Sequence, residues 1–268
     1  MGEISVLFPV AATSDPSDLN RAHRSITEQT SPPAEIVLVT NQSLTEDTET
    51  AINDLVNTHS ISRHEHFPDA KGLGGVLQAG LKGCLMPFVA RMDADDISEP
   101  ERFTHQLNVL KETNAHIVGS HLAEFRDDPE PPERTRKVPT SHNEIAEWMP
   151  WRCPVNHPTV MFDREAVLDA GGYRDFPLME DWDLWARGLA AGLQFRNLNQ
   201  TLVRANVNNL VDRREGLNYA MAEIQMAWKL RKLGVASPRD TLQHLCLRVP
   251  PRLLPSYIGK RIYDIFAR

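Results

Sequence analysis

The segment PFVARMDADD, residues 87–96, is a short apolar run that ends in three carboxylates. Two similar runs precede it, ISVLFPV at residues 4–10 and IVLV at residues 36–39. Apolar residues at helical spacing follow each of these two runs, and the same spacing recurs between Gly72 and Leu81, just before the quoted segment. Short apolar runs predict buried strands, and their alternation with helices predicts a mainly parallel sheet covered by helices. The predicted fold class is therefore α/β.

Asp93, Asp95 and Asp96 stand directly after the third predicted strand. In open α/β sheets, ligands bind at the carboxyl ends of the strands. Mg²⁺ and Mn²⁺ prefer oxygen ligands, and they take one or two carboxylates together with phosphate and water. The turn therefore predicts a site for a metal-bound diphosphate. The alternative is a solvated acidic turn ahead of a helix, because Ser98-Glu99-Pro100-Glu101 has the pattern of a capping box.

A second acidic cluster, Glu180-Asp181-Trp182-Asp183, begins a predicted helix. A carboxylate beside tryptophans is partly desolvated, which raises its pKa and suits a general base. The alternative is that these acids only favour the positive end of the helix dipole. His157 is either a ligand or a hydrogen-bonded structural group. The glycines in Gly72-Leu73-Gly74-Gly75 are a weak signal for a phosphate cradle.

Composition and charge exclude several classes of protein. The formal net charge is −7, from 29 basic and 36 acidic residues, which argues against general nucleic-acid binding. Three scattered cysteines predict neither a disulfide framework nor a structural zinc site. No stretch approaches the roughly 18 apolar residues of a membrane span, and the amino terminus lacks the basic region of a secretion signal. Residues 239–268 differ from the rest, with six basic and two acidic side chains.

In their order and spacing, these segments resemble family 2 glycosyltransferases with the GT-A fold, especially enzymes of bacterial surface-polysaccharide and amylovoran biosynthesis. The resemblance spans about residues 4–205. Further segments that carry it are Glu35–Val39, Arg102-Phe103, Val118–Ser120, Asn156–Phe162, Gly171–Tyr173 and Glu180–Trp185. It implies a cytoplasmic, inverting enzyme that moves a sugar from a nucleotide-diphosphate donor, most often a UDP-sugar, to a glycan or polyprenyl-linked acceptor. It also implies a catalytic domain over residues 1–205, with a donor-binding half to about residue 120 and an acceptor half beyond it.

Carried over residue by residue, the resemblance makes Asp95 the ligand of Mn²⁺ or Mg²⁺ and makes Asp93 a contact of the ribose or diphosphate. Asp181 is the implied catalytic base, which takes the proton of the acceptor hydroxyl as that oxygen attacks the anomeric carbon. The other donor-binding candidates are Pro9, Asn41, Gly72 and Arg91. The candidates for acceptor binding, or for support of the other groups, are Asp96, His157, Glu180 and Trp182.

Two positions depart from the family pattern. An acidic residue that contacts the nucleobase usually follows the second strand, whereas this sequence reads Thr40-Asn41-Gln42-Ser43, so the base stays open. A later histidine that completes the metal shell in some relatives is not evident around Val203–Asn206. The alternatives are a non-catalytic nucleotide-sugar or glycan-binding module and a sugar-phosphate nucleotidyltransferase. The latter lacks support because Ala11–Ser14 offers no glycine-rich basic loop.

Residues 206–268 are expected to form a helical, basic extension, with an amphipathic helix over about residues 217–233. Within it, residues 245–268 interleave basic and bulky apolar side chains. This pattern predicts either peripheral contact with the anionic inner face of the membrane or a helix packed on the domain. The sequence does not identify the sugar, the acceptor or the linkage.

Overall fold

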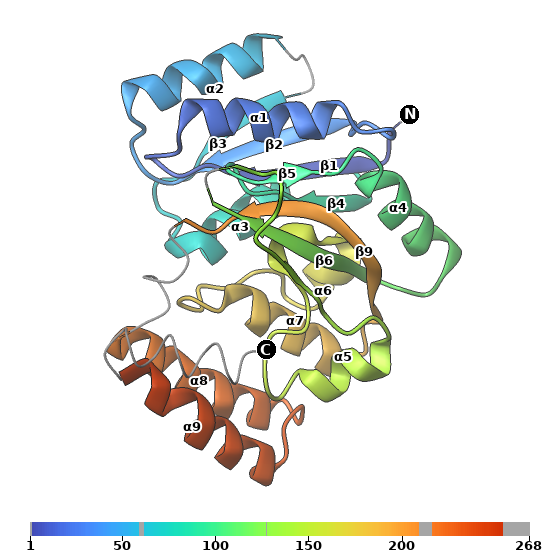
Figure 1. The fold of residues 1–268 in the computed structure, drawn as a ribbon, viewed down its shortest axis with the longest axis vertical. Coiled ribbons are helices and arrows are strands. Elements are labelled where there is room, and N and C mark those ends of the chain that lie inside the picture. Colours follow the sequence, from blue (N-terminus) through green and yellow to red (C-terminus); the bar gives the residue numbers. More distant parts are fainter. Residues whose placement is uncertain (1, 59–61, 127, 209–215, 254–268) are drawn as a thin grey trace.

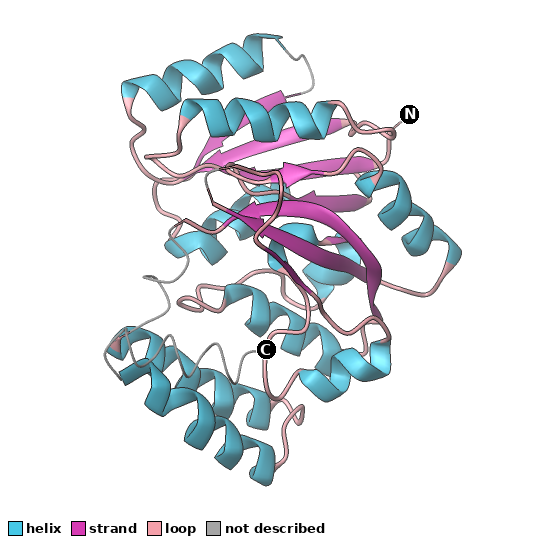
Figure 2. Cartoon of the chain, in the orientation of Figure 1, coloured by secondary structure: helices cyan, strands magenta, loops and turns pink. Residues whose placement is uncertain are grey.

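The structure, a computed structural model, describes residues 2–58, 62–126, 128–208 and 216–253. Its centre is a mixed sheet in the order β3-β2-β1-β4-β8-β6-β9-β5, with β7 paired to β6. The strands are β1 (Ile4–Pro9), β2 (Glu35–Thr40), β3 (Ser62–His66), β4 (Phe88–Arg91), β5 (Ile97–Ser98), β6 (Ile117–Phe125), β7 (Arg134–Arg136), β8 (Met161–Asp163) and β9 (Phe195–Asn206). Helices cover both faces of the sheet (Figures 1 and 2).

The helices follow the predicted alternation in the first half of the chain. They are α1 (Pro16–Thr27), α2 (Glu46–Thr58), α3 (Gly72–Gly83), α4 (Arg102–Glu112), α5 (His142–Trp148), α6 (Arg164–Asp169), α7 (Glu180–Ala190), α8 (Leu217–Lys232) and α9 (Pro238–Leu253). The start of α1 has a clear local cause, because the Asp15 side chain accepts hydrogen bonds from the backbone of Ser17 and Asp18 while Pro16 occupies the first turn.

The parallel half of the sheet is formed by β3, β2, β1 and β4; β2, β1 and β4 were predicted, whereas β3 was not. β8 then pairs antiparallel with both β4 and β6, while β6 and β9 run parallel. Every residue of β1 and β2 is buried, and apolar clusters pack on both faces of the sheet. The predicted α/β fold class is confirmed, with an antiparallel part that the sequence pattern did not predict.

Two local predictions were wrong. Ser98 does not begin a capping box, because it lies in β5 and pairs with β9, and α4 starts four residues later, at Arg102, without a side-chain cap. The segment His157–Phe162 was predicted as a strand from its sequence, but His157–Thr159 is a 3-10 turn, so β8 starts only at Met161. Proline at the second position of the turn accounts for this, since it cannot donate to a sheet ladder.

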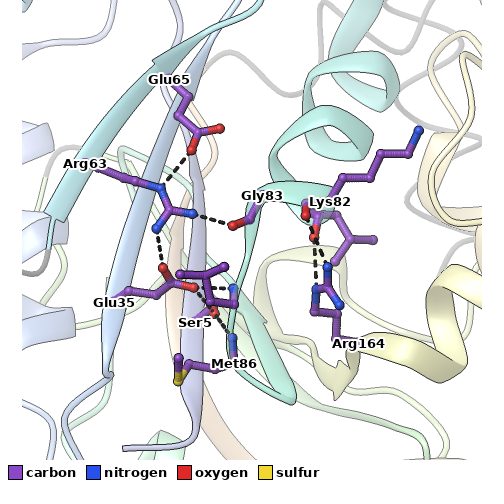
Figure 3. Close-up of polar contacts among 10 residues, drawn as sticks. Ser5, Glu35, Arg63, Glu65, Lys82, Gly83, Met86 and Arg164 are labelled. Carbon is purple, nitrogen blue, oxygen red and sulfur yellow. Dashed lines mark hydrogen bonds and ion pairs between the residues drawn. The ribbon is translucent and has the colours of Figure 1, made fainter.

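A polar network joins the amino ends of β1, β2 and β3, at the end of the strands opposite the acidic turn (Figure 3). Glu35, at the start of β2, is 6% exposed and accepts hydrogen bonds from the Ser5 hydroxyl and the Leu85 amide. Arg63 pairs with Glu35 and also donates to the Gly83 carbonyl. Burial raises the pKa of Glu35, but the hydrogen bonds and Arg63 outweigh it and leave that pKa below its usual value. The network thereby holds the turn that leads from α3 into β4.

The carboxyl-terminal helices α8 and α9 pack side by side at one end of the molecule (Figure 1). Glu223 of α8 is fully buried between them and contacts three side chains of α9, namely His244, Arg248 and Arg252. Burial opposes its ionisation, yet Arg248 and His244 prevail and lower the pKa of Glu223 to about 2. None of the helices in the described ranges is long and apolar enough to cross a bilayer.

The predicted extension coincides with these helices in part. β9 ends at Asn206, close to the predicted domain boundary, and the division into a catalytic domain and an extension stays a prediction. The predicted membrane segment, residues 245–268, falls partly on α9, while residues 254–268 lie outside the described residues.

Candidate active site

The first acidic turn lies at the carboxyl end of β4, beside the end of β1. The Met92 amide donates to the Leu7 carbonyl at 3.2 Å, which joins the turn to the parallel sheet. Arg91 is 3% exposed, and its guanidinium contacts both carboxylate oxygens of Asp93. Such a two-point contact fixes the orientation of the carboxylate as well as its charge. Asp93 therefore faces the site in a defined position.

Asp95 and Asp96 differ sharply in their surroundings. Asp95 is exposed at the tip of the turn. Partial desolvation of its carboxylate, followed by repulsion from Asp93, raises its pKa to about 6. Bulk water around the exposed side chain weakens this effect. Asp96 is 2% exposed, and one of its oxygens accepts the Asn206 amide at 3.0 Å. Its other oxygen is buried without a hydrogen-bond partner. Burial and the neighbouring carboxylates raise the pKa of Asp96 well above its usual value.

Arg102 supports the backbone next to this turn, and the sequence did not indicate this role. It is fully buried and donates to the Arg91 carbonyl at 2.8 Å and to the Val160 carbonyl at 3.3 Å. Burial, followed by the positive charge of Arg91, lowers the pKa of Arg102 to about 9. Arg102 thus fixes the backbone immediately before the acidic turn. Its signal in the sequence was the Arg102-Phe103 pair at the start of α4.

The second acidic cluster lies within electrostatic range of the first. Glu180 opens α7, and burial together with the Asp181 charge raises its pKa to about 7. The charges of Arg91 and Asp93 also act on Glu180, so the two acidic clusters share one electrostatic environment. The sequence placed these clusters almost ninety residues apart, and the fold brings them together.

Asp181 is half-buried, with both carboxylate oxygens engaged. One oxygen accepts the Trp182 amide at 2.7 Å, and the other lies 3.5 Å from the Cys153 thiol, which donates to it. Burial and the Asp181 charge raise the pKa of Cys153 well above its usual value, so the thiol keeps its proton. Cys153 is one of the three scattered cysteines to which the sequence assigned no role, and no local pattern reveals this contact.

His157 has a structural environment. It is 8% exposed, its Nε2 forms a hydrogen bond with the Tyr173 hydroxyl at 2.9 Å, and its ring packs edge-on against Trp185. Burial and the Arg91 charge hold the pKa of His157 well below its usual value, which keeps the ring neutral. Tyr173 itself is within electrostatic reach of Arg91 and of both acidic clusters. His157 and Tyr173 therefore form a buried, hydrogen-bonded pair beside the charged groups.

The glycines of α3 bring the two halves of the site into close contact. Gly72 has a φ of +59°, and a side chain there would approach Asp175. A Cβ atom at Gly74 would lie 2.1 Å from the Arg174 carbonyl oxygen and 3.1 Å from the Glu180 Cβ. Only glycine permits this approach, so α3 rests directly on the backbone that leads into α7.

Three further candidates occupy different positions. Pro9 ends β1 and pairs in register with Val39, while the Asn41 amide donates to the Ala70 carbonyl at 3.0 Å. Asn41 therefore supports the loop that precedes Gly72. Trp182 is 2% exposed, and its ring nitrogen donates to the Met149 carbonyl at 3.0 Å. The Trp182 ring thus offers little surface to an acceptor, which favours a supporting position over stacking.

The acidic turn fits a hard divalent cation through its oxygen chemistry. Asp95 is exposed at the tip of the turn, so its carboxylate oxygens are open to a cation. Among the described residues, no group of three or more His, Cys, Asp or Glu is arranged to hold an ion. A cation at this turn would therefore take its remaining ligands from the diphosphate and from water, as Mg²⁺ commonly does.

A sheet of this topology, with one acidic turn after β4 and a second acidic pair opening α7, defines a GT-A fold of the nucleotide-sugar transferase type. Residues 5–171 match the sequence profile of glycosyl transferase family 2. The chain belongs to this family and is a glycosyltransferase.

Three bacterial glycosyltransferases are similar to it over nearly their whole length. The chain is 36% identical to an uncharacterized glycosyltransferase of Haemophilus influenzae, over 99% of each chain. It is 33% identical to the amylovoran biosynthesis glycosyltransferase AmsE of Erwinia amylovora, over 97% of each chain. It is 30% identical to a UDP-Gal:α-D-GlcNAc-diphosphoundecaprenol β-1,3-galactosyltransferase of Escherichia coli, over 98% of each chain.

Solved structures confirm the fold at lower identity. The structure of Staphylococcus aureus TarS residues 1–349 with UDP-GlcNAc is 14% identical, with a TM-score of 0.68 over 99% of this chain and 76% of that one. A mannosyltransferase from Pyrobaculum calidifontis, in complex with GDP-Man and Mn²⁺, is 16% identical, with a TM-score of 0.68 over 99% and 75%. In a longer TarS chain, the similarity spans 43% of that chain.

Proposed function

We propose that this glycosyltransferase moves a hexose from a UDP-sugar to a lipid-linked glycan, with inversion at the anomeric carbon, at the cytoplasmic face of the membrane. The observation that carries the proposal is the shared environment of Asp93 and Glu180, because it brings a diphosphate-binding turn next to the helix that begins with the proposed base. The acceptor class is supported by the Escherichia coli relative, whose name specifies a diphosphoundecaprenol-linked sugar.

In the proposed reaction, Asp95 binds Mn²⁺ or Mg²⁺, which neutralises charge that develops on the leaving diphosphate. Asp93, oriented by Arg91, contacts the ribose or the diphosphate. Asp181 takes the proton from the acceptor hydroxyl while the hydroxyl oxygen attacks the anomeric carbon opposite the diphosphate. The Trp182 amide and the Cys153 thiol hold the two oxygens of this base, so the carboxylate is oriented before the acceptor arrives.

Glu180 tunes the site in this proposal. With a pKa of about 7, it carries a proton in a large share of molecules at neutral pH. A protonated Glu180 limits the negative charge beside Asp93, where an anionic diphosphate must bind. It also supplies a hydrogen-bond donor next to the proposed base.

The relatives and Asn41 support a choice of nucleobase and of cation. UDP-sugars are favoured by the Escherichia coli relative, while the two solved neighbours bind UDP-GlcNAc and GDP-Man. The Asn41 amide nitrogen is engaged by Ala70, which leaves its carbonyl oxygen to accept a hydrogen bond from a base such as uracil. Mn²⁺ is favoured by the Pyrobaculum calidifontis structure.

The test separates binding from turnover. UDP-, GDP- and dTDP-sugars are screened by calorimetry with and without Mn²⁺, and metal-dependent donor hydrolysis and transfer to a diphosphopolyprenol-linked sugar are then measured. Asp181→Asn should lower transfer by about 10²- to 10⁴-fold and leave donor affinity unchanged, since a positioned base contributes about that much. Asp95→Ala should abolish the metal-dependent part of donor binding. Asp169→Asn, on the exposed end of α6, is the matched control.

Two outcomes would contradict the proposal. Near-wild-type transfer by Asp181→Asn would show that Asp181 is not the catalytic base. Donor binding without any turnover in the wild-type chain, over the whole donor panel and with lipid-linked acceptors, would favour the non-catalytic binding module instead.

A further inference from the structure

The helices α8 and α9 carry most of the exposed apolar surface. Nine large apolar side chains are exposed in the described part of the chain, and six of them belong to these two helices: Leu217, Met221, Trp228, Leu242, Leu247 and Leu253. Exposed apolar residues gathered in one place indicate an interaction surface, whereas scattered ones do not. Both helices lie at the end of the molecule away from α1 and α2 (Figure 1).

On α8 these side chains form one stripe along the helix. Leu217, Met221 and Trp228 stand at helical spacing, with the half-buried Ile224 between them; these four residues are the α8 stripe. The opposite face of α8 is also apolar, since Met226 and Leu230 are fully buried in the core. A surface helix normally has one apolar face, which packs against the core, and polar residues on the opposite face. The α8 stripe, with Trp228 59% exposed, therefore calls for a covering partner.

The charges around the stripe define what that partner is. Arg231 and Lys232 follow the stripe on α8, and Arg239 begins the facing helix; all three are exposed. Residues 216–253 hold six basic and two acidic side chains, in a chain whose net charge is −7. One of those acids, Glu223, is fully buried. An apolar stripe with a tryptophan and a cationic border matches the boundary between anionic headgroups and acyl chains.

This surface is rigidly joined to the helix that carries the proposed base. The His244 ring of α9 stacks on Trp182 with centroids 5.5 Å apart and an interplanar angle of 26°. Lys229 of α8 lies 3.1 Å from the buried Asp183 of α7. A partner bound at the α8 stripe is therefore held at a fixed position relative to Asp181.

We propose that the α8 stripe docks on an anionic bilayer surface, with Trp228 and its apolar neighbours in the headgroup boundary and Arg231, Lys232 and Arg239 against lipid phosphates. The proposal differs from the membrane segment predicted at residues 245–268, because its contact is made by described residues of α8 and by Arg239 in the first turn of α9. It rests on the proposed function only in its purpose, which is to hold Asp181 near a lipid-linked acceptor.

The experiment measures binding of the full chain to vesicles by co-sedimentation. Vesicles of pure phosphatidylcholine are compared with vesicles of equal parts phosphatidylcholine and phosphatidylglycerol. The chain should bind the anionic vesicles, and added salt should weaken the binding. Trp228→Ser should weaken it about tenfold, as expected when one large apolar side chain leaves the interface. Arg231→Glu should weaken it by about fivefold or more.

Matched controls separate this surface from general effects of charge and apolarity. Leu85→Ser changes an apolar side chain that is 71% exposed on the turn before β4, and Arg24→Glu reverses an exposed charge on α1. Both control variants should bind as the wild type does. Circular dichroism and donor hydrolysis without vesicles should be unchanged in Trp228→Ser, which keeps loss of docking distinct from failure of the proposed function.

Three outcomes would overturn the proposal. The wild-type chain could fail to bind anionic vesicles, or Leu85→Ser could weaken binding as much as Trp228→Ser does. Sedimentation velocity could also show a dimer that Trp228→Ser converts to a monomer, with vesicle binding unaffected. In that case the α8 stripe would be an interface between two copies of this chain.

Discussion

Replacing Gly74 by alanine should disrupt the contact between α3 and the segment that leads into α7. The added Cβ would lie 2.1 Å from the Arg174 carbonyl oxygen, whereas ordinary contact requires about 3.4 Å, so the two segments must separate by about 1 Å. Overpacking of this kind costs about 1–3 kcal/mol, and alanine returns about 1 kcal/mol through its helix propensity. Because the clash is with backbone, we expect a net loss near the upper end, about 2 kcal/mol.

The same displacement should affect turnover far more than donor binding. A shift of about 1 Å between reacting groups can lower a rate by about 10²-fold. Because Glu180 lies 3.1 Å from the added atom, Gly74→Ala should move the start of α7. Sugar transfer and donor hydrolysis are measured beside calorimetric donor affinity, and stability is measured by thermal unfolding, where a drop of about 5 °C is expected.

Gly75→Ala is the matched control in the same helix. Its added Cβ would meet only Ala70, at 3.3 Å and beyond, so the variant should be as stable as the wild type or slightly more stable. Equal turnover and equal unfolding temperatures in the two variants would refute the claim that Gly74 sets the spacing between the two halves of the site.

Three further changes test the charged and strained positions. The folded chain retains the Glu180 proton up to about pH 7, while the unfolded chain releases it near pH 4.5, so rising pH destabilises the wild type. Glu180→Gln should therefore be more stable than the wild type by about 1–3 kcal/mol at about pH 8, and equally stable below about pH 4.5, as measured by thermal unfolding at each pH. Leu178 has a φ of +67° and is 48% exposed, so Leu178→Gly should stabilise the fold by roughly 0.5–1 kcal/mol in urea unfolding, and a loss would contradict the inferred backbone strain. Glu223→Gln leaves buried cations without their counter-charge and should cost about 3–5 kcal/mol, whereas a change below about 1 kcal/mol would show that the network stabilises little.

Three strands of the parallel half, β1, β2 and β4, were predictable because their signals are local, whereas the polar sequence of β3 (Ser62–His66) gave no such signal. Runs such as Ile36–Val39 are apolar throughout, and Asp15-Pro16 marks a helix start in the sequence itself. The antiparallel part was not predictable in this way. β8 is only three residues long, and it exists because β4 and β6 both offer it a partner, which is a property of the assembled sheet.

Some residues of the candidate site were likewise predictable from local patterns, and others were not. Asp93, Asp95 and Asp181 stand in recognisable patterns at predictable strand and helix ends. Arg102 and Cys153 matter because of where the fold carries them, and nothing beside them in the sequence states which groups they will meet. The Ser98 capping box failed for a related reason, since pairing of β5 with β9 outweighed a local preference.

The most direct measurement is a crystal structure of the chain with UDP and Mn²⁺, read from the anomalous signal of manganese. We expect one manganese bonded to an Asp95 carboxylate oxygen and to both phosphates, with the Asp181 carboxylate facing the β-phosphate across the space that the sugar would occupy. Manganese and UDP bound at another edge of the sheet, or an Asp181 side chain directed away from the diphosphate, would contradict it.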